Sequence, residues 1–243
     1  MSKPGWIFKA EALKIRELWA LPAYTYNYIL MAGSGVFITF EGSEGCGKST
    51  QIGRIADFLC QKGLEVITLR EPGGTPVGEA IRHLLKHDAA AAAMTPETEL
   101  LLFAASRAQL VREAIRPALD RGAVVLCDRF LDSTTVYQGV ARALDMTDVT
   151  AVNNFAIGGL LPNLTLLFDL DAAEGRRRAE RRAGPIDRME QEGGIFYDAV
   201  RQGYLALAQA DEGRFAIIDA SGSEAQVEAS IKEILQERIH GLF

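Results

Sequence analysis

The stretch that most constrains the fold is a short glycine-rich segment, Gly42–Ser49. Its letters, GSEGCGKS, match the pattern G-x-x-x-x-G-K-[ST] of phosphate-binding loops. A β-branched and aromatic run, Val36–Phe40, precedes it, and apolar residues at helical spacing follow it over Ser49–Gln61. A strand, a glycine loop and a helix N-terminus form a cradle in which backbone N–H groups and the helix dipole favour an anion. The segment therefore predicts a site for nucleotide phosphates.

Four side chains of this loop carry specific expectations. We expect Lys48 to reach the β- and γ-phosphates of the nucleotide and the Ser49 hydroxyl to bind Mg²⁺. Glu44 is unusual, because it places a carboxylate inside a loop built for anions. Cys46 lies near a helix N-terminus, where a thiolate is favoured, but we prefer to interpret it as a small residue that fills the loop. The predicted nucleotide-binding residues are Gly42, Ser43, Glu44, Gly45, Cys46, Gly47, Lys48, Ser49 and Thr50.

Composition limits the class of protein. The 243 residues are 48% hydrophobic and 24% charged, which is typical of a globular chain long enough for one α/β domain. The formal net charge of −6 argues against nucleic acid as the main partner. Cys46, Cys60 and Cys127 have no metal-binding spacing and indicate a reduced, cytoplasmic protein. His83 and His87 lie four residues apart without an apparent third metal ligand, so we interpret them as surface residues.

The start of the chain looks like an addition to the domain. An uncharged run, Leu18–Phe40, is interrupted by proline and glycine and ends in the strand before the loop, so we expect no membrane span. Residues 1–33 have two interpretations: an arm that binds a partner or a membrane surface, and a mispredicted start with Met31 as the true initiator. We favour the second, because nothing in the segment carries chemistry. The domain itself is expected to span 34–243.

From Val36 onward, short apolar strands alternate with helical segments. The predicted strands are 36–40, 65–69, 123–127, 164–168 and 215–219. The predicted helices include 49–61, 77–86, a long helix capped by Thr95 and Pro96, 133–144, 149–157 and 224–239. This alternation predicts an α/β fold, a doubly wound five-stranded parallel sheet with helices on both faces, as in P-loop NTPases. Ligands of such folds bind beyond the carboxyl ends of the strands.

Charged residues follow most of the predicted strands, and two of them suggest chemistry. We expect Asp128, together with Ser49, to hold Mg²⁺. The alternative interpretation is that Asp128 caps a helix. Arg129 adds a cation that suits an acceptor phosphate, because a guanidinium can bind phosphate oxygens in a bidentate manner.

Two further patterns concern a base and a lid. Phe103 and Arg107 lie four residues apart on one predicted helix face, where a ring and a guanidinium can stack on a base and bind its edge. The alternative is a core phenylalanine and a surface arginine. The densest arginine cluster, over 176–182, ends at a Gly-Pro break. It predicts a mobile arginine-rich lid, about 176–194, that neutralises charge and excludes water during phosphoryl transfer.

In these stretches the chain resembles the thymidylate kinases, the nucleoside-monophosphate kinases that make dTDP from dTMP and ATP for dTTP biosynthesis. The resemblance covers about 36–240. The Arg-Glu-Pro-Gly-Gly-Thr block and the Asp-Arg…Ser-Thr…Tyr-Gln-Gly block are specific to that family, whereas the phosphate loop alone is not. The matching stretches are 40–50, 70–75, Phe103 with Arg107, 128–139 and 187–190.

The resemblance implies roles on the acceptor side. In the family, the position of Phe103 stacks on thymine and that of Arg107 hydrogen-bonds its edge. The position of Tyr137 lies under the sugar, where it disfavours a 2′-hydroxyl, and the acidic residue at Glu44 faces dTMP. The dTMP-binding residues that the resemblance implies are Arg70, Phe103, Arg107, Arg129, Ser133, Thr134, Tyr137 and Gln138.

The resemblance is to the bacterial kind of the family, because Gly45 stands where other members carry a loop arginine. That kind supplies the arginine from the lid, and one extra lid residue leaves the choice open among Arg182 and Arg188, then Arg181. The implied cofactor is Mg²⁺, held by Ser49 and Asp128, with ATP as co-substrate, and the implied assembly is a homodimer. The implied catalytic residues are Lys48, Arg129, Arg182, Arg188 and Glu44.

Three alternative functions stay open at this point. The nearest is another nucleoside-monophosphate or small-molecule kinase. A deoxynucleoside kinase would phosphorylate thymidine itself instead of dTMP. A regulatory ATPase would hydrolyse ATP while binding a partner protein, although the arginine lid and the acceptor-side residues argue against it.

Overall fold

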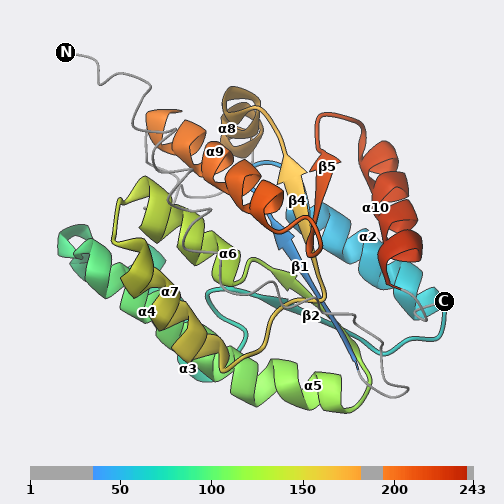
Figure 1. Cartoon of the computed structure of the whole chain (residues 1–243), viewed down its shortest axis with the longest axis horizontal. Helices are drawn as coiled ribbons and strands as arrows, with labels where there is room; N and C mark the ends of the chain where they lie inside the picture. The colour runs from blue at the N-terminus through green and yellow to red at the C-terminus, as the bar shows by residue number, and fades with distance from the viewer. Residues whose placement is uncertain (1–34, 182–193, 240–243) are drawn as a thin grey trace.

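The computed structural model describes residues 35–181 and 194–239. There, five parallel strands form one sheet in the order β2-β3-β1-β4-β5, with helices on both faces (Figure 1). The predicted doubly wound five-stranded parallel sheet is therefore confirmed. The expected N-terminal addition at 1–33 and most of the expected lid lie outside the described residues. The strands are β1 Val36–Glu41, β2 Val66–Arg70, β3 Val124–Asp128, β4 Leu164–Asp169 and β5 Phe215–Asp219.

Each strand ends on a charged residue, and four of the five strands end one residue later than predicted. The ladder continues through these residues, since Arg70 and Phe40 both pair with Asp128, and Asp169 pairs with Asp219. Backbone pairing does not require an apolar side chain, so the apolar runs miss the last paired residue of these strands at the solvated edge. The result is a row of charged side chains along the carboxyl edge of the sheet.

Five of the described α-helices begin at a polar side chain that caps their first turn. Thr95 caps α4 by accepting a hydrogen bond from the backbone N–H of Thr98, and Pro96 follows it in the first turn, as expected. Ser223 and Gln226 form a capping box at the start of α10. The helices are α2 Lys48–Gln61, α3 Pro76–Lys86, α4 Pro96–Leu110, α5 Arg116–Asp120, α6 Leu131–Thr134, α7 Met146–Ile157, α8 Ala172–Glu180, α9 Gly194–Ala210 and α10 Glu224–Arg238.

The predicted helix over 133–144 is wrong in its boundaries. Helix α6 begins earlier, at Leu131, whose side chain is buried, and continues into a π-helical segment, Thr135–Ala141. Ala143 then adopts a positive φ of 57°, which ends the helical path. The Asp145 side chain caps α7, so this helix also starts before its predicted position.

The core lies on both faces of the sheet. Alternate residues of β1 divide between them, so that Ile38 and Phe40 pack towards α2 and α10, and Phe37 packs with the segment that joins α4 to α5. Figure 1 shows α2 and α10 side by side on one side of the sheet. Helix α9 covers β4 through Tyr204 and its neighbours. Within the described part of the chain, no helix is long and apolar enough to cross a bilayer.

Candidate active site

The glycine-rich segment forms a tight loop between the end of β1 and the start of α2. Gly45 and Gly47 adopt positive φ angles of 73° and 93°, a conformation that glycine adopts without steric cost. A Cβ atom at Gly45 would also lie 2.0 Å from the carbonyl oxygen of Gly175 at the start of α8. The glycines therefore let the loop turn tightly and let α8 pack directly against it.

Lys48 opens α2, and its side chain is buried inside this loop. The Nζ atom donates to the carbonyl oxygens of Gly42, at 3.1 Å, and Ser43, at 2.8 Å. It also lies 3.3 Å from the Cys46 Sγ atom, which in turn donates to the Ser43 carbonyl. The predicted phosphate-binding lysine thus places its positive charge at the centre of the loop.

Ser49 and Asp128 come together although 79 residues separate them. The Ser49 hydroxyl donates to Asp128 Oδ2 at 2.8 Å, because β3 pairs with β1 and ends beside the loop. Within the described ranges, no cluster of three His, Cys, Asp or Glu side chains could hold a metal ion. Mg²⁺ at phosphate sites takes one or two protein oxygens and completes its shell with phosphates and waters. The Ser49–Asp128 pair fits that kind of site.

Arg129 joins the phosphate loop to the neighbouring site residues. Its Nη2 atom donates to Glu44 Oε1 at 2.7 Å, and its Nη1 atom donates to the hydroxyls of Ser133 and Tyr204, both at 3.2 Å. The guanidinium carbon lies 5.1 Å from the centre of the Tyr137 ring. Together these residues make a cationic site with an aromatic wall beside the loop.

The Glu44 carboxylate lies on the same side as Arg129 and Tyr137. Burial acts to raise its pKa, but Arg129 and then Lys48 outweigh burial and hold the pKa at about 2. Glu44 is therefore ionised at neutral pH and offsets part of the positive charge of Arg129. The orientation of Glu44 towards dTMP, which the family resemblance implies, stays a prediction.

Arg107 is a buried hub of the site. Its guanidinium donates to Glu71 Oε2, Asn153 Oδ1 and Thr134 Oγ1, each at 2.8 Å, and to the Phe130 carbonyl at 3.3 Å. The alternative interpretation of Arg107 as a surface residue is therefore wrong, since its side chain is only 1% exposed. An i, i+4 pattern cannot report this burial, because the acceptors come from three distant segments.

Phe103, Gln138 and Tyr137 lie on elements around this hub. Phe103 is half-buried one turn before Arg107 on α4, and Gln138 donates to Glu99 Oε1 at 2.8 Å. Tyr137 is buried between Arg129, Tyr204 and Phe196. Its hydroxyl has no hydrogen-bond partner within the described residues.

The structure does not bring the Arg70 side chain into this cluster. Arg70 ends β2 directly opposite Asp128, but its guanidinium turns to α3 and donates to both carboxylate oxygens of Glu79, at 2.8 and 2.9 Å. Glu79 also accepts from the backbone N–H of Gly74 at 2.8 Å. The short connection between β2 and α3 therefore places the Glu79 carboxylate of α3 within reach of the Arg70 guanidinium.

Three arginines at the start of the expected lid are paired with other residues of the described chain. Arg176 donates to Glu180, and Arg177 donates to Glu174, so both cover a solvated helix face. Arg178 donates to Glu174 and to the carbonyl of Ala220 after β5. Two of the predicted catalytic arginines, Arg182 and Arg188, lie outside the described residues.

Glu41 is a site residue that sequence patterns did not select. It ends β1, is fully buried, and accepts from the Phe130 backbone N–H at 2.7 Å, the Ser133 hydroxyl at 2.6 Å and the Tyr204 hydroxyl at 2.8 Å. Its place directly before the loop was a possible signal, whereas nothing in the sequence marked Tyr204, which lies 163 residues away. Burial and the nearby Asp132 raise the pKa of Glu41 from 4.5 to about 7.

This pKa predicts how stability depends on pH. Between about pH 4.5 and 7 the folded state keeps a proton on Glu41 that the unfolded chain has lost, so the free energy of unfolding falls as pH rises. Glu41→Gln is expected to flatten that fall by about 3 kcal/mol in urea unfolding across this range. Glu71, whose pKa burial also raises to about 7, titrates in the same range, and the charge of Glu41 adds a smaller part of that rise, which Glu41→Gln removes. Asp57→Asn, at an exposed site, is the control, and a Glu41→Gln slope equal to the wild-type slope would contradict the assignment.

Comparisons with known proteins point to one family. The thymidylate kinase family model matches residues 40–231. The thymidylate kinase of Chromohalobacter salexigens is 49% identical over 205 residues, which cover 84% of this chain and 97% of that relative. The corresponding enzyme of Geobacter sulfurreducens is 47% identical over 210 residues, 84% of this chain and 98% of the relative. That of Pseudomonas syringae pv. tomato is 50% identical over 204 residues, 84% of this chain and 96% of the relative.

Proposed function

The chain belongs to the thymidylate kinase family, and from this premise we propose how its residues divide the transfer of a phosphoryl group from ATP to dTMP. ATP occupies the phosphate loop, with Lys48 on its phosphates. The acceptor dTMP occupies the site beyond Glu44. The observation that carries this division is the Glu44–Arg129 ion pair at 2.7 Å, which links the loop to a second cationic site.

On the acceptor side, Arg129 binds the 5′-phosphate of dTMP. The half-buried Phe103 stacks on thymine, and Arg107, held by Glu71 and Thr134, presents its guanidinium edge to the base. Tyr137, which packs against Arg129, lies under the sugar. Four contacts fix Arg107, so the geometry of base recognition exists before the nucleotide binds.

The transfer proceeds in line, without a covalent enzyme intermediate. The acceptor phosphate is already anionic, so the reaction needs no strong general base, and catalysis comes from positioning and charge neutralisation. Mg²⁺, which Ser49 and Asp128 would hold, supplies positive charge to the phosphates when it is bound. Arg182 and Arg188, then Arg181, are the candidates for the lid arginine that neutralises the transferring group.

A nucleotide panel tests this function. We expect dTMP to give the highest kcat/KM with ATP, dUMP to lose about 10- to 100-fold for the missing methyl group, and UMP, CMP and AMP to lose at least about a thousandfold. Turnover of thymidine but not dTMP would instead identify a deoxynucleoside kinase. Fast ATP hydrolysis without any acceptor would identify an ATPase. Lys48→Ala serves as the inactive control for contaminating kinases.

We also propose a cytoplasmic homodimer, by resemblance to the family. All three cysteines are free, which suits a reducing compartment. The exposed apolar side chains of Val77, Leu101 and Phe155 lie on α3, α4 and α7, where α4 packs against both of the other helices, and they offer apolar surface to a second copy. Light scattering should return twice the chain mass of 26.5 kDa, and the single-chain mass would contradict the dimer.

A further inference from the structure

Arg129 adopts a backbone conformation that its residue type disfavours. Its φ angle is 70°, in the left-handed region, where a non-glycine residue costs roughly 1–2 kcal/mol. Such strain persists only where the surrounding structure determines the conformation from several sides. The contacts of the following residues, up to Ser133, show what holds this turn in place.

Two sets of contacts brace the turn, and the first of them comes from β1. The backbone N–H of Arg129 donates to the Phe40 carbonyl at 3.0 Å, which continues the sheet pairing by one step. The next residue, Phe130, donates its N–H to Glu41 Oε1, and the Ser133 hydroxyl donates to Glu41 Oε2. The single carboxylate of Glu41 therefore binds Phe130 near the start of the turn and Ser133 at its end.

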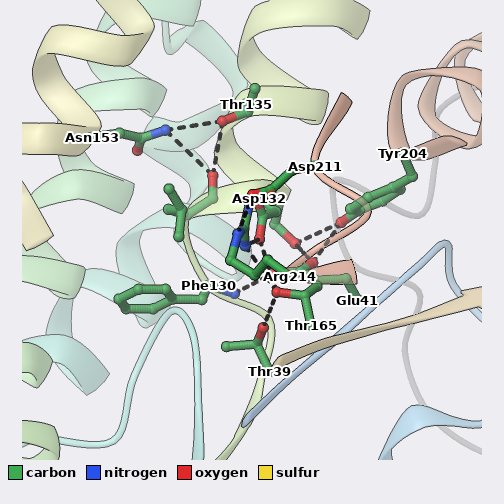
Figure 2. A network of polar contacts seen from close by, with 12 residues as sticks. Thr39, Glu41, Phe130, Asp132, Thr135, Asn153, Thr165, Tyr204, Asp211 and Arg214 are labelled. Carbon is green, nitrogen blue, oxygen red and sulfur yellow. Dashed lines mark hydrogen bonds and ion pairs between the residues drawn. The ribbon is translucent and has the colours of Figure 1, made fainter. Parts of the chain in front are cut away.

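The second brace comes from Arg214, which lies just before β5 and 82 residues after Asp132 in the sequence (Figure 2). Its Nη1 and Nη2 atoms donate to the two carboxylate oxygens of Asp132, at 2.6 and 3.0 Å. Nη1 also donates to the Thr165 hydroxyl of β4 at 2.9 Å, and Nε donates to Asp211 at 2.9 Å. The Thr165 hydroxyl in turn lies 2.9 Å from that of Thr39 on β1.

This second brace is buried, and its contacts reach β4 through Thr165 and β1 through Thr39. The Asp132 side chain is 0% exposed and that of Arg214 is 6% exposed. Figure 2 shows the pair between the turn after β3 and the central strands that carry Thr39 and Thr165. A buried ion pair is often no more stabilising than apolar residues of the same volume. A contribution to stability is therefore a weak explanation for two buried charges at this place. A more specific explanation is that Arg214 fixes the direction of the Asp132 side chain.

We propose that the Asp132–Arg214 ion pair is a positioning device for Arg129: it holds the strained 129–133 turn so that the Arg129 guanidinium meets the acceptor phosphate. Arg214 is a positioning residue and not a catalytic one, because the hydrogen bonds that its side chain makes within the described residues go to the buried Asp132 and Thr165 and to the half-buried Asp211. The proposal rests on the proposed role of Arg129, so a wild-type protein that fails to phosphorylate dTMP would refute the function first and separately.

The test is a cycle of variants around Arg129. The paired change Asp132→Leu with Arg214→Met removes both charges and so leaves no unpaired charge in the core. We expect kcat/KM for dTMP to fall about 10- to 100-fold, since a displacement of about 1 Å costs rates of this order, while KM for ATP stays within about twofold. In the Arg129→Ala background the same pair of changes should cost less than about threefold, because the group that it positions is gone.

A matched control separates positioning from general stability. Asp211→Asn removes the other ionic partner of Arg214 but leaves the Asp132 contact intact. It should lower the urea midpoint yet keep kcat/KM for dTMP within about threefold. Equal activity losses with and without Arg129, or an equal loss in Asp211→Asn, would overturn the proposal. If the paired variant does not fold, Arg214→Lys, which keeps the charge but loses the bidentate geometry, enters the same cycle with the same criteria.

Discussion

Arg129→Ala is expected to lower kcat/KM for dTMP by about a thousandfold while the fold stays intact. The wild-type guanidinium contacts Glu44, Ser133 and Tyr204 and lies over the Tyr137 ring. Its removal takes away the cation of the acceptor site and leaves the negative charge of Glu44 facing an incoming phosphate without the opposing charge of Arg129. Both effects act on the acceptor, so most of the loss should appear with dTMP as the varied substrate.

Two further variants make this expectation specific. Arg129→Gly should be as inactive as Arg129→Ala but more stable than it by about 1 kcal/mol, because glycine tolerates the φ of 70° at this position. Arg121→Ala, at an exposed site where the side chain pairs with Glu65, is the control for loss of one arginine and should keep wild-type rates. Steady-state kinetics with urea unfolding of each protein measure both quantities. Activity in Arg129→Ala within tenfold of wild type would refute the acceptor role of Arg129.

The fold was predictable because each of its signals is local. The strands are short apolar runs, the phosphate loop has its own letters, and Thr95 with Pro96 marks a helix start within two residues. The predicted strand ends are wrong where backbone pairing continues past the last apolar residue. Asp128, for example, continues the ladder of β3 although its side chain is charged.

The site was predictable only in part, because its hydrogen bonds depend on the folded arrangement. Ser49 and Asp128 were paired correctly, since parallel strands bring their carboxyl ends to one edge. Arg70 was expected at the acceptor, but Glu79, nine residues later, binds its guanidinium once the loop after β2 turns back. A local sequence pattern does not show whether the Arg70 guanidinium binds this nearby carboxylate or a ligand.

Among the residues that brace the 129–133 turn, only Glu41 had a signal in the sequence, its place directly before the phosphate loop. Glu41 and Tyr204 are 163 residues apart, and Asp132 and Arg214 are 82 residues apart. Each is an ordinary residue in its own segment and gains its role from the order of the strands, which places β1 between β3 and β4. A single sequence contains such pairs but does not identify them.

Lys48→Ala is expected to lower kcat by at least about a thousandfold, because it removes the cation that the loop holds for the transferring phosphate. In the structure, Nζ donates to the carbonyls of Gly42 and Ser43, so the charge already lies where the loop curves around it. Lys48→Arg should not restore the rate, since a planar guanidinium is larger than an ammonium group and cannot fit the same cradle. Single-turnover assays with both nucleotides saturating would isolate this step.

The two variants together test the division of the loop into an ATP side and a dTMP side. Lys48→Ala should weaken ATP binding while dTMP binding stays within about threefold, and Arg129→Ala should do the reverse, as measured by calorimetric titration of each nucleotide. Lys48 and Arg129 both act on Glu44, whose pKa they lower, with Arg129 the stronger of the two. A modest change in dTMP affinity in Lys48→Ala is therefore consistent with Glu44 on the acceptor side. If both variants lost more than about threefold in affinity for the same nucleotide, Glu44 would not separate the two substrates, and the proposed division would be wrong.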